Sequence, residues 1–263
     1  MIEEIYIRRY DIIAICHEAA KAILYHYTQM SQNIEIKHDN SPVTTADKAS
    51  NDILVSNLNR LFPHIPIISE ESKHIPYAER SSWEYCFIID PLDGTKEYLK
   101  RNNEFCINVA LAHKQKIVAG FIYIPVTNVC YYAIIGKGAY KKHNNMETQV
   151  FNKKIISNTL TIAGSRSHNN IELDIAINQY KKTFPQVNII YIGGAIKFGY
   201  LAEGIIDVYF RYGPTSEWDT AAGHIIIEEA GCVIFDISNQ ELIYNKPDLL
   251  NPSFIAKNKS VHD

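Results

Sequence analysis

Cysteine is scarce in this chain of 263 residues, and its pattern argues against two kinds of site. The five cysteines are odd in number, widely spaced and never arranged as CxxC. Such a set speaks against a zinc site and against a disulfide framework, and it predicts reduced thiols in a cytosolic compartment. The five positions are Cys16, Cys86, Cys106, Cys130 and Cys232.

Long hydrophobic runs are also missing. No apolar stretch approaches the roughly 20 residues that are needed to span a bilayer. The first residues mix acidic and basic side chains between Glu3 and Arg9, so we expect no signal-peptide core there. These absences predict a cytoplasmic protein without a transmembrane segment, and they leave open a peripheral attachment to the inner face of the cell membrane.

The chain also has no excess of positive charge. The formal net charge is -3, which gives no support for binding a nucleic-acid polymer, although a local basic pocket stays compatible with it. The composition, with 46% hydrophobic and 21% charged residues, is that of an ordinary globular protein. The length predicts one large domain or two small ones that share an interface.

The first half of the chain reads as helices followed by strands. Apolar side chains recur at helical spacing over residues 5–30, and a second helix is predicted from Thr44 or Thr45, which can cap its free amides, to Leu61. Period-two and apolar runs then predict strands, of which the last three form an antiparallel meander. The predicted strands are 65–69, 85–89, 106–112, 117–124 and 129–134.

Residues 141–156 are polar, and we predict that they are irregular and form a domain boundary. It separates an N-terminal α+β part, residues 1–145, from a C-terminal α/β part, residues 146–263. Strands and helices alternate in the second part, which predicts a layered arrangement. The predicted strands are 159–163, 187–192, 206–210 and 232–236, and the predicted helices are 170–183, one opening at Gly193-Gly194, and 219–230.

Two aspartates follow an apolar strand at Asp90 and Asp93, with Pro91 between them. Proline has no N–H to donate and resists extending a sheet, so we expect the chain to turn there. The turn would bring both carboxylates and the Leu92 carbonyl to one side of the strand end. Hard oxygen ligands without nearby Cys or His suit Mg²⁺ better than zinc.

Two further acidic clusters also stand at the ends of apolar elements. Glu70 closes a short buried strand, and Asp219 begins a helix, where a negative charge is favoured. Taken singly, a DxxD turn is usually solvated surface and an aspartate at a helix start is usually a cap. Three such clusters stand at the ends of elements, where open α/β folds place their sites. We therefore regard a metal site and ordinary surface charge as equally good interpretations of these residues.

Two weaker signals concern anion binding. Gly193 and Gly194 open a predicted helix and could offer bare amides to a phosphate, although an ordinary loop is an equally good interpretation. The run 164–168 places Ser165, Arg166 and His168 after a strand, where a polar loop is the commoner outcome. Neither segment is a Walker loop, because the spacing and the following Ser or Thr are absent.

Taken in order, four segments resemble the inositol monophosphatase superfamily. DPxDGT followed by a later WDxAAG is a specific combination, and the resemblance spans nearly the whole chain. DPLDGTKE, Gly-Ser-Arg-Ser-His, Lys197-Phe198 and Gly213-Pro214-Thr215 look most like its CysQ-type 3'(2'),5'-bisphosphate nucleotidase branch. The four segments are SPVTTAD at 41–47, ISEES at 68–72, IDPLDGT at 89–95 and EWDTAAG at 217–223.

The resemblance implies a layered α-β-α-β-α sandwich that binds two or three Mg²⁺ ions. It implies that Asp47 and Thr95 orient and deprotonate the attacking water. The implied metal ligands are Glu70, Asp90, the Leu92 carbonyl, Asp93 and Asp219. The implied substrate contacts are Glu70, Leu92, Asp93, Gly94, Thr95, Ser165, His168, Gly193, Lys197, Arg211 and Asp219. Gly194 and Ala195 stand where many relatives carry serine, so side-chain hydrogen bonding is not expected there.

The activity so implied is hydrolysis of adenosine 3',5'-bisphosphate to AMP and phosphate, a reaction of sulfur metabolism, in a lithium-sensitive monomer or homodimer. Lys197 with Arg166 or Arg211 would counter the charge of the second phosphate. The alternatives are an inositol monophosphatase or another sugar phosphatase on the same fold, and a non-enzymatic magnesium-binding regulatory protein. A haloacid-dehalogenase phosphatase needs DxDxT, which the aspartates at 90 and 93 do not form.

Overall fold

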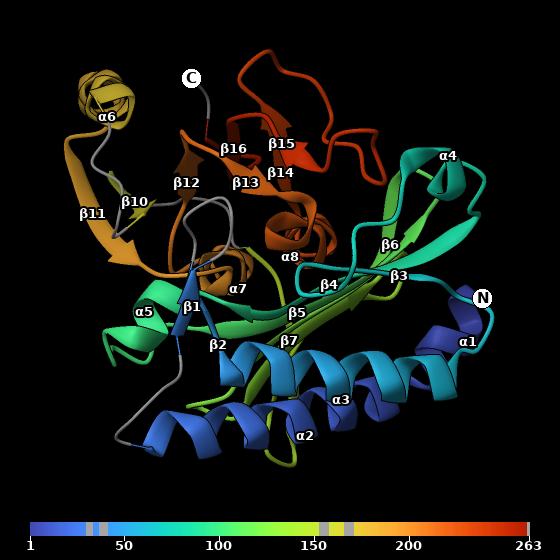
Figure 1. Ribbon diagram of the computed structural model, residues 1–263. Coiled ribbons are helices and arrows are strands. Elements are labelled where there is room, and N and C mark those ends of the chain that lie inside the picture. Colours follow the sequence, from blue (N-terminus) through green and yellow to red (C-terminus); the bar gives the residue numbers. More distant parts are fainter. Residues whose placement is uncertain (30–33, 37–41, 153–157, 166–170, 262–263) are drawn as a thin grey trace.

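The computed structural model describes residues 1–29, 34–36, 42–152, 158–165 and 171–261, and it stacks them in five layers (Figure 1). Helices form the first, third and fifth layers and two sheets form the second and fourth. The α-β-α-β-α sandwich is therefore confirmed. Among the described residues, no helix is both long and apolar enough to cross a membrane.

The first layer and the first sheet come from the N-terminal half. The layer holds α1 (Ile2–Ile7), α2 (Arg9–Thr28) and α3 (Thr45–Leu61). The seven strands follow one another across the sheet in chain order, with β3 parallel to β4 and every later pair antiparallel. They are β3 (Ile67–Ser69), β4 (Tyr85–Asp93), β5 (Cys106–His113), β6 (Lys116–Ile124), β7 (Val129–Ile134), β8 (Gly138–His143) and β9 (Met146–Val150).

The remaining layers come from the C-terminal half. The third layer holds α7 (Ile196–Glu203) and α8 (Glu217–Glu229), and the fifth holds α6 (Ile171–Thr183). Between them lies a five-stranded sheet of order β11-β10-β12-β16-β14. Its strands are β10 (Thr159–Ser165), β11 (Gln186–Ile192), β12 (Val208–Arg211), β14 (Cys232–Asp236) and β16 (Phe254–Asn258).

Short elements complete the described chain around these layers. Two helices of a few residues, α4 and α5, follow β3 and β4, and two small antiparallel sheets pair β1 with β2 and β13 with β15. Their bounds are α4 (Tyr77–Arg80), α5 (Thr95–Leu99), β1 (Ile34–Ile36), β2 (Pro42–Thr44), β13 (Thr215–Ser216) and β15 (Leu250–Asn251).

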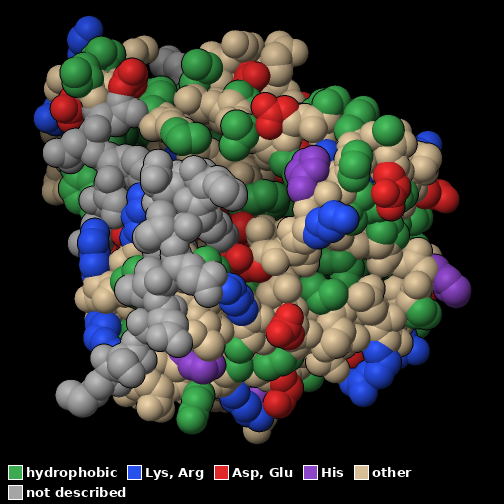
Figure 2. Space-filling view, in the orientation of Figure 1, with side chains coloured by type: hydrophobic (Ala, Val, Ile, Leu, Met, Phe, Trp, Pro, Cys, Tyr) green, Lys and Arg blue, Asp and Glu red, His purple; other side chains and the backbone are tan. Residues whose placement is uncertain are grey.

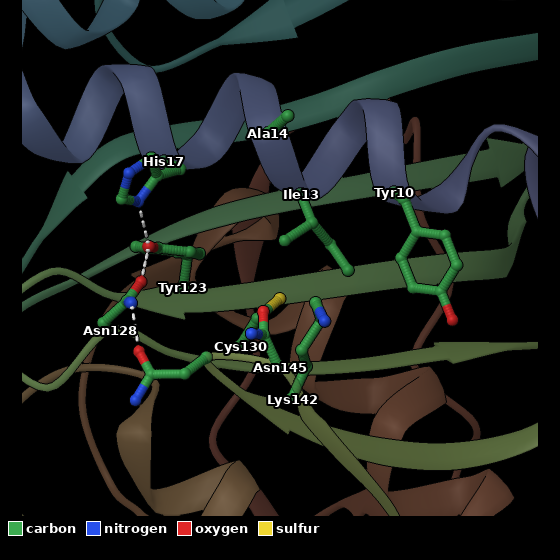
Figure 3. Close-up of a pocket in the computed structure, with 10 residues that line it drawn as sticks. Tyr10, Ile13, Ala14, His17, Tyr123, Asn128, Cys130, Lys142 and Asn145 are labelled. Carbon is green, nitrogen blue, oxygen red and sulfur yellow. Dashed lines mark hydrogen bonds between the residues drawn. The ribbon is translucent and has the colours of Figure 1, made fainter.

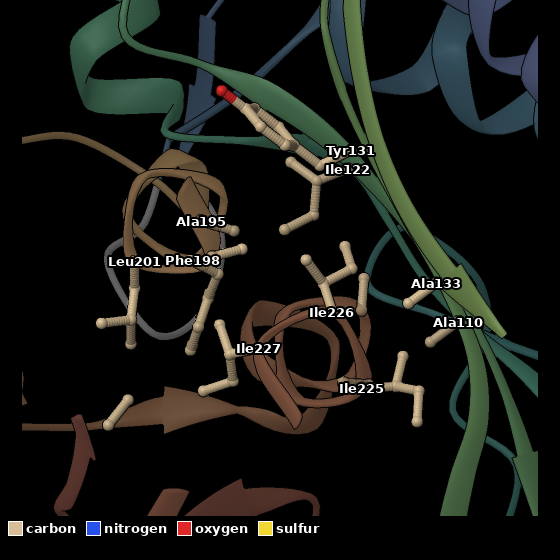
Figure 4. Packing of buried hydrophobic residues seen from close by; sticks show 14 of the residues in the cluster. Ala110, Ile122, Tyr131, Ala133, Ala195, Phe198, Leu201, Ile225, Ile226 and Ile227 are labelled. Atoms are coloured by element: carbon tan, nitrogen blue, oxygen red, sulfur yellow. The ribbon is translucent and has the colours of Figure 1, made fainter. Parts of the chain in front are cut away.

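The central helix α8 packs directly against the first sheet. A Cβ on Gly120 of β6 would lie 2.4 Å from the carbonyl oxygen of Ala222, so only glycine permits this approach. Ile225 and Ile226 of α8 face the sheet, and Ile227 lies on the side of α8 that faces α7 (Figure 4). The close packing fixes the start of α8 relative to the ends of β4 and β5.

The sequence prediction was incomplete, and it contained none of the short elements α4, α5, β1, β2, β13 and β15. The meander is confirmed, but the predicted irregular segment 141–156 is wrong for β8 and β9, which form an outer hairpin whose exposed side chains lack an apolar alternation. The expected boundary between residues 145 and 146 falls in the turn of that hairpin, and the two-part division stays a prediction. Strand β16 was missed, although it pairs with both β12 and β14.

Candidate active site

Three aspartates meet where β4 ends and α8 begins. One carboxylate oxygen from each of Asp90, Asp93 and Asp219 lies within 4.8 Å of the others. Figure 2 shows acidic side chains inside a hollow on this face of the molecule. The predicted gathering of these side chains is therefore present, and the tertiary fold joins residues more than a hundred positions apart.

A bulge in β4, rather than a turn out of the sheet, aims the two neighbouring aspartates. Asp90 pairs with Asn108 and Asp93 pairs with Cys106, so two residues of β4 stand opposite one residue of β5. The expected turn at Pro91 was wrong, because a bulge absorbs a residue that cannot donate to the ladder. The Ser50 hydroxyl secures the bulge by donating to the Pro91 carbonyl at 2.7 Å.

The aspartate cluster is electrostatically unfavourable when it is empty of cations. Burial, followed by the charges of Glu70, Asp93 and Asp219, raises the pKa of Asp90 well above its usual range. Burial and the charge of Asp93 raise the pKa of Asp219 to about 7. Several buried carboxylates with oxygen donors alone fit a hard divalent cation such as Mg²⁺, which would offset both penalties.

Glu70 joins the cluster from the end of β3. Its backbone N–H donates to the Ile89 carbonyl at 3.3 Å, which continues the parallel pairing of β3 with β4 past the last residue of β3. The nearby charge of its carboxylate is one of the causes, after burial, of the raised pKa of Asp90. The predicted ligand Glu70 is thus brought to the aspartates.

Asp219 serves both as a helix cap and as a site residue. The Ser216 N–H donates to Asp219 Oδ2 at 2.7 Å, and the two residues form a capping box at the start of α8. The cap fixes the side chain on the first turn of the helix, beside Asp93. The helix-cap interpretation of Asp219 is therefore confirmed, and its role as a metal ligand stays a prediction.

Asp47 and Thr95 lie beside the aspartates as a hydrogen-bonded pair. The Thr95 hydroxyl is 3.2 Å from Asp47 Oδ1 and also 3.2 Å from the Leu92 carbonyl, and it can donate its one proton to either. Asp47 is held by Thr44, whose N–H and hydroxyl donate to Asp47 Oδ2 at 2.8 and 2.6 Å. Burial raises the pKa of Asp47. The predicted contact between Asp47 and Thr95 is therefore present in the structure.

A left-handed glycine places Thr95 at the start of α5. Gly94 has a φ of +91°, and a Cβ there would lie 2.8 Å from the Glu104 carbonyl oxygen. Only glycine tolerates both conditions without strain. The DGT sequence thus has a local reason: Gly94 turns the chain so that the next hydroxyl points back to Asp47.

The turn at Gly193 and Gly194 lies against the carboxylates. The Gly193 N–H donates to Glu104 Oε2 at 2.9 Å, and the Ala195 N–H donates to Asp93 Oδ2. Helix α7 begins two residues later than predicted for an opening at Gly194, at Ile196. The Gly193 amide, one of the two that could have met a phosphate, therefore binds a carboxylate of the protein in this structure.

Lys197 lies buried beneath that turn. Its ammonium donates to the Ile192 carbonyl at 2.9 Å and to the Gly194 carbonyl at 2.7 Å, and its side chain is only 3% exposed. Burial lowers the pKa of Lys197 to about 8, against the charge of Asp93, which raises it. Its role as a nucleotide contact stays a prediction, while its role in holding the turn is visible.

Three predicted nucleotide contacts share one edge of the second sheet. Strands β10, β11 and β12 are mutually parallel, and their carboxyl ends carry Ser165, Gly193 and Arg211. Arg211 donates to the Pro214 carbonyl at 3.0 Å. His168 and Arg166 lie outside the described residues. Ends of parallel strands are a common location for ligand sites in such sheets.

Two residues beside the carboxylates, Asn108 and Glu104, were not predicted from the sequence. Asn108 of β5 lies 3.4 Å from Asp93 Oδ2 and 3.3 Å from the Trp218 carbonyl, so its amide group joins β4 to α8. A buried asparagine within the apolar run CINVALA was the available signal. Glu104, which accepts from Gly193, had no such signal because it stands in a polar loop.

A second hollow lies on the opposite face of the first sheet, under α2. It encloses about 660 Å³ and is lined by residues of α2, β6, β7 and the β8–β9 turn. A hydrogen-bond chain crosses it from His17 to Tyr123, at 2.6 Å, and on to Asn128 and Asn144 (Figure 3). None of the predicted site residues lines this hollow, so the carboxylates and this chain are separate features.

The chain belongs to the inositol monophosphatase family, whose model matches residues 7–263. It is 37% identical over 247 residues to the 3'(2'),5'-bisphosphate nucleotidase CysQ of Aggregatibacter actinomycetemcomitans, with 93% of this chain and 90% of that protein covered. It is 40% identical over 219 residues to CysQ of Salmonella typhimurium, with 83% and 86% covered.

Solved structures agree with this assignment. The crystal structure of CysQ from Bacteroides thetaiotaomicron matches with a TM-score of 0.83 at 38% identity, covering 93% of this chain and 94% of that one. The IMPase of Thermotoga maritima matches with a TM-score of 0.75 at 22% identity and supports the fold alone.

Proposed function

We propose that the protein is a magnesium-dependent 3'(2'),5'-bisphosphate nucleotidase that converts adenosine 3',5'-bisphosphate to AMP and phosphate. The observation that carries the proposal is the contact between two parts of the site. The Asp90–Asp93–Asp219 cluster lies beside the Thr95–Asp47 pair, which has no use in a protein that only binds a metal. Similarity to CysQ proteins at 37% and 40% identity supports the choice of substrate.

The carboxylates and the Leu92 carbonyl are the groups that would hold Mg²⁺. When bound, the metal neutralises phosphoryl oxygens, acidifies a water and stabilises the leaving oxygen, which a phosphate monoester dianion requires. We propose Glu70, Asp90, Leu92, Asp93 and Asp219 as ligands of two or three ions. Asp93 and Asp219 each have one oxygen bonded to a backbone N–H, which fixes their orientation.

The Thr95 hydroxyl orients the attacking water and relays a proton to Asp47. The contact between these two residues supports this relay, because Thr95 Oγ1 lies 3.2 Å from Asp47 Oδ1. The Asp47 carboxylate is a stronger base than an exposed aspartate, since burial raises its pKa. In-line attack then depends on positioning and electrostatics, and no covalent phosphoenzyme is formed.

The edge of the second sheet would receive the nucleotide. We propose that Ser165, His168, Gly193 and Arg211 contact it, with Arg166 or Arg211 countering the second phosphate. Lys197 contributes its positive charge from beneath the turn. A sugar monophosphate would have no second phosphate to use these cations, which favours the bisphosphate nucleotide over inositol phosphate.

A substrate comparison tests the proposal. The purified chain with Mg²⁺ is given adenosine 3',5'-bisphosphate or inositol 1-phosphate, and released phosphate is measured. We expect a clear preference for the nucleotide; a preference for inositol 1-phosphate would replace the substrate while keeping the site. A phosphorylated aspartate trapped during turnover would instead point to the haloacid-dehalogenase mechanism, and no hydrolysis of any phosphate ester would favour the regulatory alternative.

The cellular setting is part of the same proposal. We propose a cytoplasmic enzyme of sulfur metabolism, inhibited by lithium and by calcium, that acts as a monomer or homodimer. All five cysteines are buried free thiols, which suits a reducing compartment.

A further inference from the structure

A buried polar cluster lies behind the carboxylates and joins three separate segments of the chain. It consists of Arg80, Glu217, Asn245 and Lys246, which we call the polar clamp. Arg80 is 1% exposed, Glu217 0% and Asn245 5%. Charged groups are rarely so deeply buried unless they are paired, and here each one has several partners.

Arg80 and Asn245 bind each other in both directions. The Arg80 guanidinium donates to Asn245 Oδ1 at 2.7 Å, and the Asn245 amide group donates back to the Arg80 carbonyl at 2.9 Å. The guanidinium also donates to the Ile75 carbonyl at 2.8 Å and to the Lys246 carbonyl at 3.1 Å. The planar fork of arginine is what lets one side chain reach these acceptors together.

Glu217 binds the same segment from α8. Its carboxylate accepts from the N–H groups of Asn245 and Lys246 at 2.6 and 2.9 Å, and from the Lys246 ammonium at 2.8 Å. Asn245 has a φ of +53°, a left-handed conformation. Successive N–H groups around such a residue can converge on one anion, which is the arrangement observed.

The two ends of the clamp lie in the segments that carry two proposed metal ligands. Arg80 ends the segment that begins with Glu70, and Glu217 stands two residues before Asp219 on the first turn of α8. A hollow of about 100 Å³ between these segments is lined by Glu70, Arg80 and Trp218, among others. The clamp therefore links the segment that follows Glu70 to the start of α8.

We propose that the polar clamp is a positioning device that sets the spacing of Glu70 and Asp219 for the cation. The inference rests on the metal site of the proposed function. It concerns residues that touch neither metal nor substrate and act through the ligands. A buried ionic network is weak evidence for stability by itself, since apolar replacements are often as stable, so a role in fixing geometry is the better account.

The test is Arg80→Lys in the full chain. Lysine keeps the positive charge, but one ammonium cannot replace the fork that joins Asn245, Ile75 and Lys246. We expect the dissociation constant for Mg²⁺, measured by calorimetry well below the melting temperature, to rise about tenfold or more, as supporting residues of metal sites usually show. The Mg²⁺ concentration for half-maximal hydrolysis should rise in parallel.

The control separates positioning from general stability. Ile177→Ala removes packing in the cluster beneath α6, far from the carboxylates, and should lower the melting temperature without changing Mg²⁺ affinity. An Arg80→Lys protein that melts early yet binds Mg²⁺ within twofold of wild type would overturn the proposal. If Arg80→Lys does not fold, the near-isosteric Glu217→Gln, which loses the charge facing Lys246, carries the same expectation.

Calorimetry also distinguishes the two proposals from each other. A wild-type chain that binds Mg²⁺ but does not hydrolyse adenosine 3',5'-bisphosphate would refute the substrate and leave the clamp testable. A wild-type chain that binds no Mg²⁺ at millimolar concentration would overturn the clamp as a positioning device together with the metal site.

Discussion

The buried ammonium of Lys197 donates to the Gly194 carbonyl at 2.7 Å, and the N–H of that same peptide unit, on Ala195, donates to Asp93. The lysine therefore holds the turn that holds a proposed metal ligand. Removing the ammonium would leave the Gly194 and Ile192 carbonyls without this donor, and an unsatisfied buried polar group costs about 1–3 kcal/mol.

From this relationship we predict that Lys197→Met weakens Mg²⁺ affinity and lowers kcat, because Asp93 loses both its support and a nearby positive charge. Calorimetry and steady-state kinetics provide the two measurements. Lys116→Met is the matched control, since the Lys116 side chain is 71% exposed and pairs with Glu241 at the surface. A rise in KM for the nucleotide alone, with Mg²⁺ affinity unchanged, would instead make Lys197 a direct substrate contact.

The proton relay predicts a difference between two substitutions at one position. Thr95→Ala removes the hydroxyl and should lower kcat by roughly 10²–10⁴, the usual contribution of a positioned proton-transfer group. Thr95→Ser keeps the hydroxyl and should retain most of the activity. Equal losses in the two variants, measured at saturating Mg²⁺, would show that packing of the threonine methyl group matters rather than its hydroxyl.

Asp93→Asn should abolish activity without unfolding the protein. The amide has nearly the same shape, and its oxygen can still accept from the Ala195 N–H, so the turn at Gly194 keeps its partner. Only ligand charge is lost. Circular dichroism should match wild type while Mg²⁺-dependent phosphate release disappears, and full activity in this variant would refute the site.

The stability of the metal-free protein should depend on pH in a defined direction. Burial raises the folded-state pKa of Asp90, and it raises the folded-state pKa of Asp219 to about 7. The pKa of an aspartate in the unfolded chain is lower, about 3.9. The folded state therefore binds more protons. The stability that the folded protein gains from these bound protons is fully present below about pH 4, and it is lost as the pH rises through about 7.

Mg²⁺ needs the ionised carboxylates, so its binding should release protons and strengthen across the same range. The increase in melting temperature caused by Mg²⁺ should be larger at pH 8 than at pH 6. Thermal melts with and without Mg²⁺ at the two values check this, with Asp93→Asn as the variant in which the metal effect should vanish. An increase that does not change with pH would argue that the cluster is already ionised without metal.

Local sequence patterns are enough to locate much of the site. Asp90, Glu70 and Asp219 each end or begin an apolar element, and this pattern depends only on neighbouring residues. The pairing of Asp47 with Thr95 came from a family resemblance, because 48 positions separate the two and no local rule joins them. A threonine cap at Thr44 or Thr45 was predicted, and the structure places it at Thr44, in a capping box that spans only four residues.

Other features could not be read from the chain. The β4 bulge depends on which residue of β5 stands opposite Pro91, and the burial of Lys197 depends on the sheet that packs over α7. The polar clamp joins Arg80 to Asn245, 165 positions apart, and neither residue belongs to a recognisable pattern. Long-range pairing of this kind is decided by packing and not by local preference.

The sequence by itself determined the kinds of ligand atoms, the helix caps and the glycine that turns Thr95 towards Asp47, because these follow from side-chain chemistry and local backbone conformation. The tertiary structure alone decided which oxygens face one another, since their spacing comes from the packing of α8 against β5 and β6. It also decided that Lys197 and the clamp act from behind the site, because burial exists only once the layers are stacked.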